Sequence, residues 1–385
     1  MLGSRMNEVS AIRWVFFLQP FILGAWFPRI PQVQATLELS AGQLAFALIG
    51  MPIGLLTALS VGPRLAEALG TRRLLVVGLL AQGLLLPVPG FATSGPVLFA
   101  ALALAGVALA AAQLSLNVTA SVVEAHSERL IMNGCHGFWS IGVLLGSAAG
   151  VLCAAYGIAP GHALVVIAAL VTLPLLLIAR TITNHAVPAP PQEQTKGPAL
   201  SRPLALIALF AFGIAMTEGA MADWAAVYLT DVFSALPATA GAGYTVFALF
   251  VATGRFIGDP LKARIPVDRL AGGFVAIALV GLTILVFGNS LALAFVGISL
   301  LGLGVSLGFP LAVSAVSILP GRSSAANVAL LTQMALCGFL VGPPVIGIIA
   351  DYSSMQGGLA ALAPALLAAL VLARQLKPPA PPAKS

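Results

Sequence analysis

Apolar residues gather in long runs along this chain, and short polar segments separate the runs. A helix that crosses a membrane needs about 20 mostly apolar residues, and twelve runs reach that length. Lipid offers backbone N–H and C=O groups no partner, so each run must be helical. We therefore expect an all-α polytopic membrane protein with spans at Ile12–Ile30, Gly42–Gly62, Leu74–Phe91, Val97–Val123, Cys135–Tyr156, His162–Ile178, Leu204–Tyr228, Ala240–Ile257, Leu270–Phe287, Leu291–Ile318, Ala325–Ala350 and Gly358–Ala373.

The positive charges indicate the orientation of these spans. With the N-terminus inside, all but two of the 18 Lys and Arg residues fall in inner loops and tails, the exceptions being Arg29 and Arg255. Lys and Arg are enriched in cytoplasmic loops. We expect a multi-pass protein of the bacterial inner membrane with both termini in the cytoplasm.

The spans divide into two sets of six. Residues 181–203 are rich in Pro and polar residues and are typical of an extended linker. We expect an N-terminal bundle over 1–180, this cytoplasmic linker, a C-terminal bundle over 204–374 and a disordered tail over 375–385.

The composition supports the membrane assignment and excludes other classes. Hydrophobic residues make up 59% of the chain and charged residues 8%, against about 25% charged in soluble domains. A soluble enzyme or a nucleic-acid binder is therefore excluded. The sequence has no Walker loop and no HExxH motif, and its three cysteines have no CxxC spacing. We expect no cofactor, no metal and no enzymatic activity.

The two halves of the chain match at a nearly constant offset. Trp26 pairs with Trp224 at an offset of 198, and Gly142 and Gly146 pair with Gly338 and Gly342 at 196. Further matches join Gly106-Val107 to Gly304-Val305, and Gly62, Leu65, Arg73 and Leu74 to Gly258, Leu261, Arg269 and Leu270. Such internal similarity indicates two parallel repeats of six helices each.

The loop that follows the second span carries a recognisable motif. The run from Gly62 to Arg73 resembles the signature of the major facilitator superfamily (MFS), although its acid, Glu67, lies one residue late. The run from Gly258 to Arg264 resembles the second copy of that signature. The resemblance implies an MFS fold of two pseudo-symmetric bundles and a role in the conformational switch for Glu67, Arg72, Arg73, Asp259 and Arg264.

Three other stretches resemble the branch of the superfamily that includes fucose permease and the YbjJ-like membrane proteins. They are Gly24–Pro31, Asn133–Gly142 and Glu218–Leu229. Fucose permease-like proteins place one acid where Gln113 stands and another in the first span, which is apolar in this chain. Their coupling mechanism therefore does not transfer.

Glu218 is the acid placed nearest the middle of a span. A charge there costs about 2.5–3.5 kcal/mol on insertion scales, and intramembrane ionisable groups are functional by default. We expect Glu218 to take up and release a proton as the protein changes conformation, the alternative being a permanently protonated acid. Asp223 and His136 are further candidates for proton coupling, and Asp223 is alternatively expected to pair with Arg29 as a gate or a structural ion pair.

The solute is expected to meet polar and aromatic side chains at the membrane midplane. Gln113 and Asn117 share one helical face because they are four residues apart. Candidates for solute contact are Gln113, Asn117, Trp26, Trp139, Ser140, Trp224, Tyr228, Tyr244, Phe247 and Gln333. Small residues allow helices to slide, so Gly142, Gly146 and Gly342 are expected to act in the conformational switch, although close packing alone would also explain them.

These features favour a secondary active transporter that moves a small polar, sugar-like solute by proton symport and alternating access. The alternatives are proton-coupled efflux of an amphipathic compound or metabolite and a transporter-like membrane sensor. The expected partners are the solute, protons and the lipid bilayer, without nucleic acid, and we expect a monomer.

Overall fold

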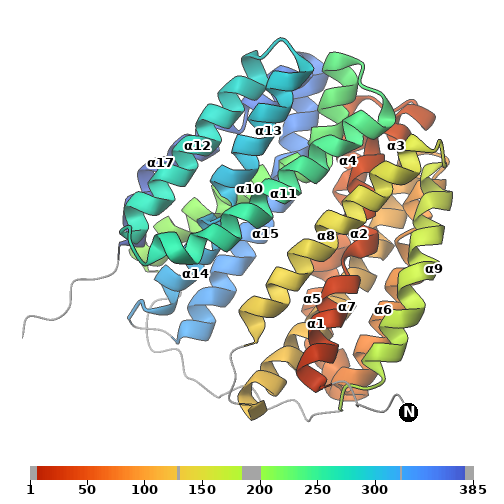
Figure 1. Cartoon of the computed structure of the whole chain (residues 1–385), viewed down its shortest axis with the longest axis vertical. Helices are drawn as coiled ribbons and strands as arrows, with labels where there is room; N and C mark the ends of the chain where they lie inside the picture. The colour runs from red at the N-terminus through yellow and green to blue at the C-terminus, as the bar shows by residue number, and fades with distance from the viewer. Residues whose placement is uncertain (1–6, 128–130, 184–200, 321–322, 378–385) are drawn as a thin grey trace, which may run out of the picture. The chain divides into compact units, whose positions relative to one another are not determined.

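A computed structural model describes residues 7–127, 131–183, 201–320 and 323–377 of the chain (Figure 1). These residues form helices without strands, and twelve helical stretches are long and apolar enough to cross a membrane, which confirms the expected number of spans. Most of the expected linker, 184–200, and the tail from 378 onward lie outside the described residues. The helices are α1 (Glu8–Leu18), α2 (Phe21–Trp26), η1 (Phe27–Arg29), α3 (Ile30–Thr36), α4 (Ala41–Leu48), α5 (Gly50–Leu69), α6 (Thr71–Leu85), η2 (Val88–Phe91), α7 (Gly95–Ser127), α8 (Met132–Ala155), α9 (Pro160–Ala179), α10 (Arg202–Phe233), α11 (Pro237–Lys262), α12 (Val267–Phe287), α13 (Leu291–Val305), α14 (Gly308–Ser317), α15 (Ser324–Tyr352), α16 (Met355–Ala360), α17 (Ala363–Leu372) and η3 (Ala373–Leu376).

Contacts divide the chain into two compact units. Unit 1 comprises Met1–Pro190 with Ala226–Thr245, and unit 2 comprises Pro191–Ala225 with Val246–Ser385. In unit 1, α5 and α6 pack against α7, α6 also packs against α9, and α1 and α2 pack against α8 (Figure 1). In unit 2, α12 packs against α13 and α17. The contacts group residues 226–245 with unit 1, and the predicted assignment of all of 204–374 to the second bundle stays a prediction.

Side-chain caps explain where several helices begin. The Asn7 side chain accepts a hydrogen bond from the backbone N–H of Val9 at the start of α1. Ser40 and Gln43 form a capping box at the start of α4. Ser290, Ser323 and Ser354 cap α13, α15 and α16 in the same manner. Each cap satisfies one backbone donor that the first turn leaves free.

Proline interrupts some spans but not others. Pro20 lies between α1 and α2, and Pro310 lies in the first turn of α14 after the break that follows α13. Pro343 and Pro344 instead lie inside α15, which continues to Tyr352. Their missing N–H groups remove two donors from the ladder, but the helix does not end there.

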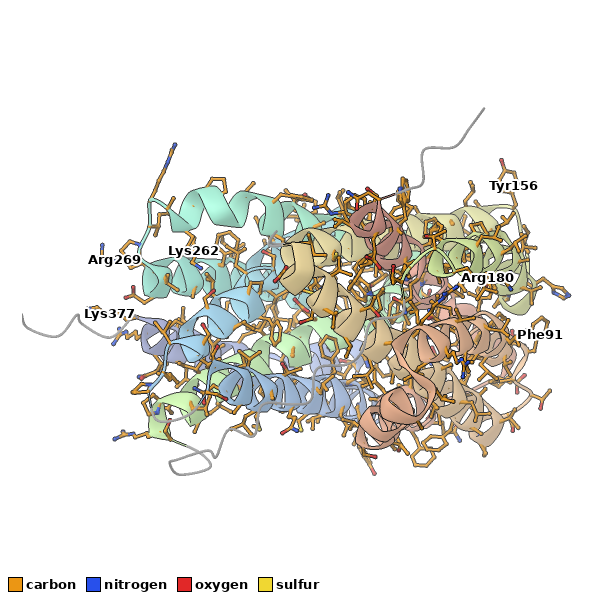
Figure 2. All side chains as sticks on the ribbon, turned by 90° about the horizontal axis from the view of Figure 1, so that it is seen from below. Phe91, Tyr156, Arg180, Lys262, Arg269 and Lys377 are labelled. Atoms are coloured by element: carbon orange, nitrogen blue, oxygen red, sulfur yellow. The ribbon has the colours of Figure 1, made fainter. Side chains whose placement is uncertain are left out.

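The two ends of each unit differ in chemistry. One end carries exposed aromatic side chains, which include Phe91 and Tyr156 in unit 1 and Phe287 and Tyr352 in unit 2. Phe91 and Tyr156 project away from the ribbon in Figure 2. The opposite end carries Arg72, Arg73 and Arg180 in unit 1 and Lys262, Arg264, Arg269, Arg374 and Lys377 in unit 2. Aromatic residues favour membrane interfaces and cations favour cytoplasmic loops, so each unit has the polarity expected of a membrane bundle.

In each unit, two glycines four residues apart bring a pair of helices into close contact. A Cβ on Gly142 or Gly146 of α8 would collide with the carbonyl oxygen of Phe17 or Phe21, respectively. In unit 2, a Cβ on Gly338 would lie 2.5 Å from the carbonyl oxygen of Phe212 on α10, and one on Gly342 would lie 2.8 Å from that of Met216. The repeated glycines therefore let α8 and α15 approach the backbone of their partner helices, as small residues do in membrane bundles.

This packing predicts the effect of a single added methyl group. Gly146→Ala places a Cβ against the Phe21 carbonyl, and overpacking of this kind costs about 1–3 kcal/mol. We expect a clear fall in the apparent melting temperature of the purified protein in detergent. The matched control is Gly137→Ala on the same helix, where a Cβ meets nothing within 4 Å. Equal melting temperatures for the two variants would contradict the packing role of Gly146.

Candidate functional site

A pair of opposite charges lies inside the spans of unit 2. The Nη2 atom of Arg255 on α11 is 3.6 Å from the Oε1 atom of Glu218 on α10. Glu218 lies near the middle of the seventh span, 202–233, and Arg255 lies in the last two turns of α11. The sequence analysis marked Arg255 as a cation inside a span, but it did not join it to Glu218.

The helix that carries Glu218 is well anchored in unit 2. Its span is the most buried of the twelve, and 72% of its most apolar 18-residue segment is buried. Gly338 and Gly342 bring α15 against α10, and a Cβ on Gly219, next to Glu218, would lie 2.6 Å from the Phe339 ring. The backbone at Glu218 is therefore closely packed against α15.

The pair is held by charge rather than by a direct hydrogen bond. Its distance of 3.6 Å exceeds the 2.7–3.2 Å of an N–H···O hydrogen bond. The Oε1 atom of Glu218 is buried and accepts no hydrogen bond among the described residues. The Glu218 side chain is 17% exposed, and the Arg255 side chain is 32% exposed. An acceptor held in this way can take a proton without breaking an existing hydrogen bond.

Two predicted solute contacts lie on α7 in unit 1. Gln113 and Asn117 are one turn apart, as expected, and both are half-buried. The Oε1 atom of Gln113 is buried and accepts no hydrogen bond from the described part of the chain. A buried unsatisfied acceptor costs about 1–3 kcal/mol, so this amide suits a ligand that donates a hydrogen bond.

Arg29 bonds to two backbone carbonyl groups within unit 1. Arg29 ends η1, is fully buried and donates from Nη1 to the carbonyl oxygen of Gly150 at 3.3 Å and from Nη2 to that of Ile158. It thereby ties the end of the first span to the end of the fifth. Asp223 is half-buried on α10 in unit 2. Its predicted pairing with Arg29 stays a prediction.

His136 lies near the end of its span rather than in the middle. It is in the second turn of α8, is exposed, and its ring contacts Phe16 edge-on at 5.6 Å. The Ser140 hydroxyl donates to the His136 carbonyl at 3.1 Å, one turn away on α8. Nε1 of Trp139 is buried and donates no hydrogen bond to the described residues. The predicted role of His136 in proton coupling stays a prediction.

The remaining aromatic candidates are mostly buried. In unit 1, Trp26 and Tyr228 are fully buried, and the Tyr244 ring lies 4.5 Å from that of Phe27. One residue beyond Tyr244, the Thr245 hydroxyl lies 2.7 Å from that of Ser147. In unit 2, Trp224 and Phe247 are buried, and Gln333 on α15 is exposed. The structure leaves the predicted roles of these side chains as predictions.

The switch residues predicted from the loop signature lie at the cationic ends of the units. The Nη2 atom of Arg72 donates to the carbonyl oxygen of Arg180 at 2.8 Å, and Arg73 and Arg264 are exposed. The side chains of Glu67 and Asp259 lie outside the described ones. Gly70, between α5 and α6, has a φ of 76°, a conformation that glycine adopts without a steric penalty.

Sequence reasoning missed two buried polar contacts in unit 1. Gln19, at the break before Pro20, donates from Nε2 to Gln82 Oε1 at 2.9 Å, and Gln82 Nε2 donates to the Gln19 carbonyl at 2.7 Å. Glu124 accepts from the backbone N–H groups of Ile131 and Met132 at 2.6 and 2.8 Å. An isolated Gln within a span was the available signal for the first contact. No group of three or more His, Cys, Asp or Glu gathers among the described residues, so we propose no metal centre.

Comparison with known proteins agrees with this architecture. Residues 12–234 match the profile of the Major Facilitator Superfamily. An uncharacterized MFS-type transporter of Yersinia pestis is 28% identical over 375 residues, which cover 96% of this chain and 96% of that protein. The crystal structure of the nucleoside transporter NupG has a TM-score of 0.76 at 12% identity and covers 96% of this chain and 99% of its own. A variant of the E. coli fucose:proton symporter FucP has a TM-score of 0.58 at 17% identity, with 98% and 100% covered.

The chain therefore belongs to the Major Facilitator Superfamily. It is an all-α, multi-pass membrane transporter with twelve spans and the two pseudo-symmetric bundles of that fold, and it is not an enzyme. The expectation of an MFS protein is confirmed, whereas membership of the YbjJ-like branch stays a prediction.

The ion pair predicts unequal effects of removing its two members. Arg255→Gln removes the cation that lies beside the Glu218 carboxylate, which is the more buried member of the pair. Glu218→Gln removes the carboxylate that lies beside the Arg255 guanidinium, which is the more exposed member. We expect Arg255→Gln to lower stability by about 1–3 kcal/mol, less than for a fully buried pair because both groups are partly exposed. The apparent melting temperature in detergent measures this loss.

The double variant Glu218→Gln/Arg255→Gln should recover part of that loss, because it no longer contains the buried carboxylate from which Arg255→Gln removes the cation. Arg264→Gln is the control, since Arg264 is an exposed arginine that follows the same helix. Additive losses in the double variant would contradict an interaction between Glu218 and Arg255.

Proposed function

We propose that this chain is a secondary active transporter that moves a small polar, sugar-like solute across the inner membrane together with protons. The single observation that carries the proposal is the Glu218–Arg255 pair inside the spans of unit 2. Ionisable residues within membrane spans mark proton relays and ion pathways in transporters.

Proton uptake at Glu218 would change the electrostatic attraction between Glu218 and Arg255. While Glu218 is ionised, it compensates the charge of Arg255 across α10 and α11. Protonation removes the negative charge of Glu218 and with it the attraction between the two side chains. A second arrangement of the helices, in which Arg255 meets water or solute, then becomes more favourable, so that the proton drives alternating access.

The chemistry of the solute follows from the neutral polar groups. Gln113 offers a buried acceptor with no hydrogen bond from the described residues, and Asn117 lies one turn away. Amide side chains suit hydroxyl-bearing solutes because they both accept and donate hydrogen bonds. The likeness in fold to a nucleoside transporter and a fucose:proton symporter agrees with this solute class.

Proton-coupled efflux of an amphipathic compound is the second candidate. The paucity of hydrophilic side chains in the spans and the glycine stripe of α8 favour it. The direction of solute movement in an imposed pH gradient distinguishes the two functions. A membrane sensor would bind solute without moving it. We further propose that both termini lie in the cytoplasm, on the strength of the cationic ends of the two units.

The central test is uptake into proteoliposomes with an imposed pH gradient. We expect Glu218→Gln to reduce gradient-driven accumulation tenfold or more, because a neutral amide cannot carry a proton. Solute exchange without a gradient should survive, because it needs no net proton movement. Asp231→Asn is the matched control, since Asp231 is exposed and lies on the same helix, and it should accumulate solute as the unaltered protein does.

Unchanged gradient-driven accumulation in Glu218→Gln would remove this residue from the coupling mechanism. Asp223→Asn and His136→Gln would then be compared in the same assay. Outward rather than inward accumulation would select efflux.

The solute is found by a thermal-shift screen of sugars, polyols, nucleosides, amino acids and organic acids, because a ligand that binds the folded state raises its melting temperature. We expect a hydroxyl-rich neutral solute to raise it. Gln113→Ala should reduce that shift and raise the KM for transport about tenfold, since a hydrogen bond is worth about 0.5–1.5 kcal/mol. Gln34→Ala is the control, because Gln34 on α3 bonds locally to the Leu39 carbonyl. An unaltered shift in Gln113→Ala would contradict its role in solute binding.

A further inference from the structure

A basic depression lies at the cationic end of unit 1. Its volume is about 520 Å³, and it is lined by Leu69, Arg72, Arg73, Val76, Val77 and Arg180. This volume falls within the roughly 300–1,000 Å³ of small-molecule sites. The lining combines three guanidinium groups with three aliphatic side chains, and none of the described residues that line it is acidic.

The three arginines are brought together from two helices. Arg72 and Arg73 lie in the first turn of α6, and Arg180 follows the last residue of α9. Arg72 donates to the carbonyl oxygen of Arg180 at 2.8 Å, which couples the two helix ends. Arg73 and Arg180 are exposed, and Arg180 is labelled in Figure 2. An anion that lies between the guanidinium groups of Arg73 and Arg180 would be attracted by both.

The start of α6 adds to the positive potential at the depression. The first turn of a helix carries a partial positive charge and is stabilised by anions, not cations. Gly70 precedes α6 and supplies no side-chain cap. The helix start therefore adds to the positive potential that the guanidinium groups create.

Two exposed apolar stripes lead away from the arginines along the outside of unit 1. On α6 the stripe continues from Arg73 through Val77, Leu80 and Leu84, and these three side chains are exposed. On α9 it continues from Arg180 through exposed Leu177, Leu173, Leu170 and Val166. The helices are neighbours, since α6 packs against α9 and a Cβ on Gly83 would collide with Thr172. The spacing of three and four residues places each stripe on one helical face.

We propose that this depression binds the headgroup of an anionic phospholipid, with Arg73 and Arg180 contacting the phosphodiester and the acyl chains lying along the stripes of α6 and α9. Basic pockets between membrane helices on the cytoplasmic side suit such headgroups. Guanidinium groups bind phosphate oxygens through paired N–H donors. The aliphatic lining from Leu69, Val76 and Val77 matches a lipid better than a free phosphate ion, which would lose hydration against these walls without gaining contacts.

The test measures lipid binding to the full-length protein. Purified protein is titrated with mixed micelles that contain cardiolipin or phosphatidylglycerol, and bound lipid is counted by native mass spectrometry. Parallel samples receive phosphatidylcholine micelles or inorganic phosphate alone. We expect cardiolipin and phosphatidylglycerol to bind and to raise the apparent melting temperature, with little effect of phosphatidylcholine or phosphate.

The double variant Arg73→Gln/Arg180→Gln should weaken anionic lipid binding about tenfold or more, because each basic residue near an anionic surface contributes to binding. The matched control is Arg269→Gln/Arg374→Gln, which removes two exposed arginines at the cationic end of unit 2. Arg269 is the repeat counterpart of Arg73. We expect this control to bind lipid at the cardiolipin site as the unaltered protein does, and circular dichroism verifies that both variants are folded.

Three results would overturn the proposal. Unchanged lipid binding in Arg73→Gln/Arg180→Gln would exclude the depression as the site. Equal weakening in both double variants would indicate general attraction between cations and the lipid surface. A response to inorganic phosphate as large as the response to cardiolipin would indicate a free-anion site in place of a lipid site.

Discussion

Hydrocarbon supplies no hydrogen-bond partner, and this constraint governs every polar group in the spans of this protein. The backbone meets it by forming helices throughout the spans. Arg29 meets it by donating to the carbonyl oxygens of Gly150 and Ile158, and Gln19 meets it through Gln82. Ten buried side-chain atoms of the described residues have no hydrogen-bond partner, and they include Nε of Arg29 and Oε1 of Gln19 beside Oε1 of Gln113 and Oε1 of Glu218. Unpaired buried groups of this kind call for an explanation, and function is one candidate.

Close approach of helices is the second feature that shapes both units. Gly142 and Gly146 face backbone carbonyls of the first span, and Gly338 and Gly342 face those of α10. Without a hydrophobic drive between helices in lipid, contact depends on packing and on small residues. The same solution in each repeat explains why glycines recur at an offset of 196 residues. In unit 2 this close packing involves α10, the helix that carries Glu218. The Oε1 atom of Glu218 accepts no hydrogen bond from the described residues.

The ion pair and the basic depression serve different purposes in our proposals. Glu218 and Arg255 are within the spans of unit 2, where a change in protonation would alter the balance between two conformations. Arg73 and Arg180 are at the cationic end of unit 1, where we propose that they contact an anionic headgroup. Charges within the spans thus suit coupling, and charges at their ends suit contact with the membrane surface.

The sequence by itself determined the class, the number of spans and the chemistry of their ends, because hydrophobic length and the distribution of cations are local properties of the chain. It also identified Glu218 as an acid within a span and the glycine repeat, since both are visible as residue types at particular positions. Only the tertiary structure decided which groups meet: Glu218 with Arg255, Arg29 with two carbonyl oxygens, and Gln19 with Gln82. It also showed that α15 continues through Pro343 and Pro344 and that residues 226–245 contact unit 1. These outcomes depend on the register and rotation of helices that are distant in sequence, which no local pattern of residues encodes.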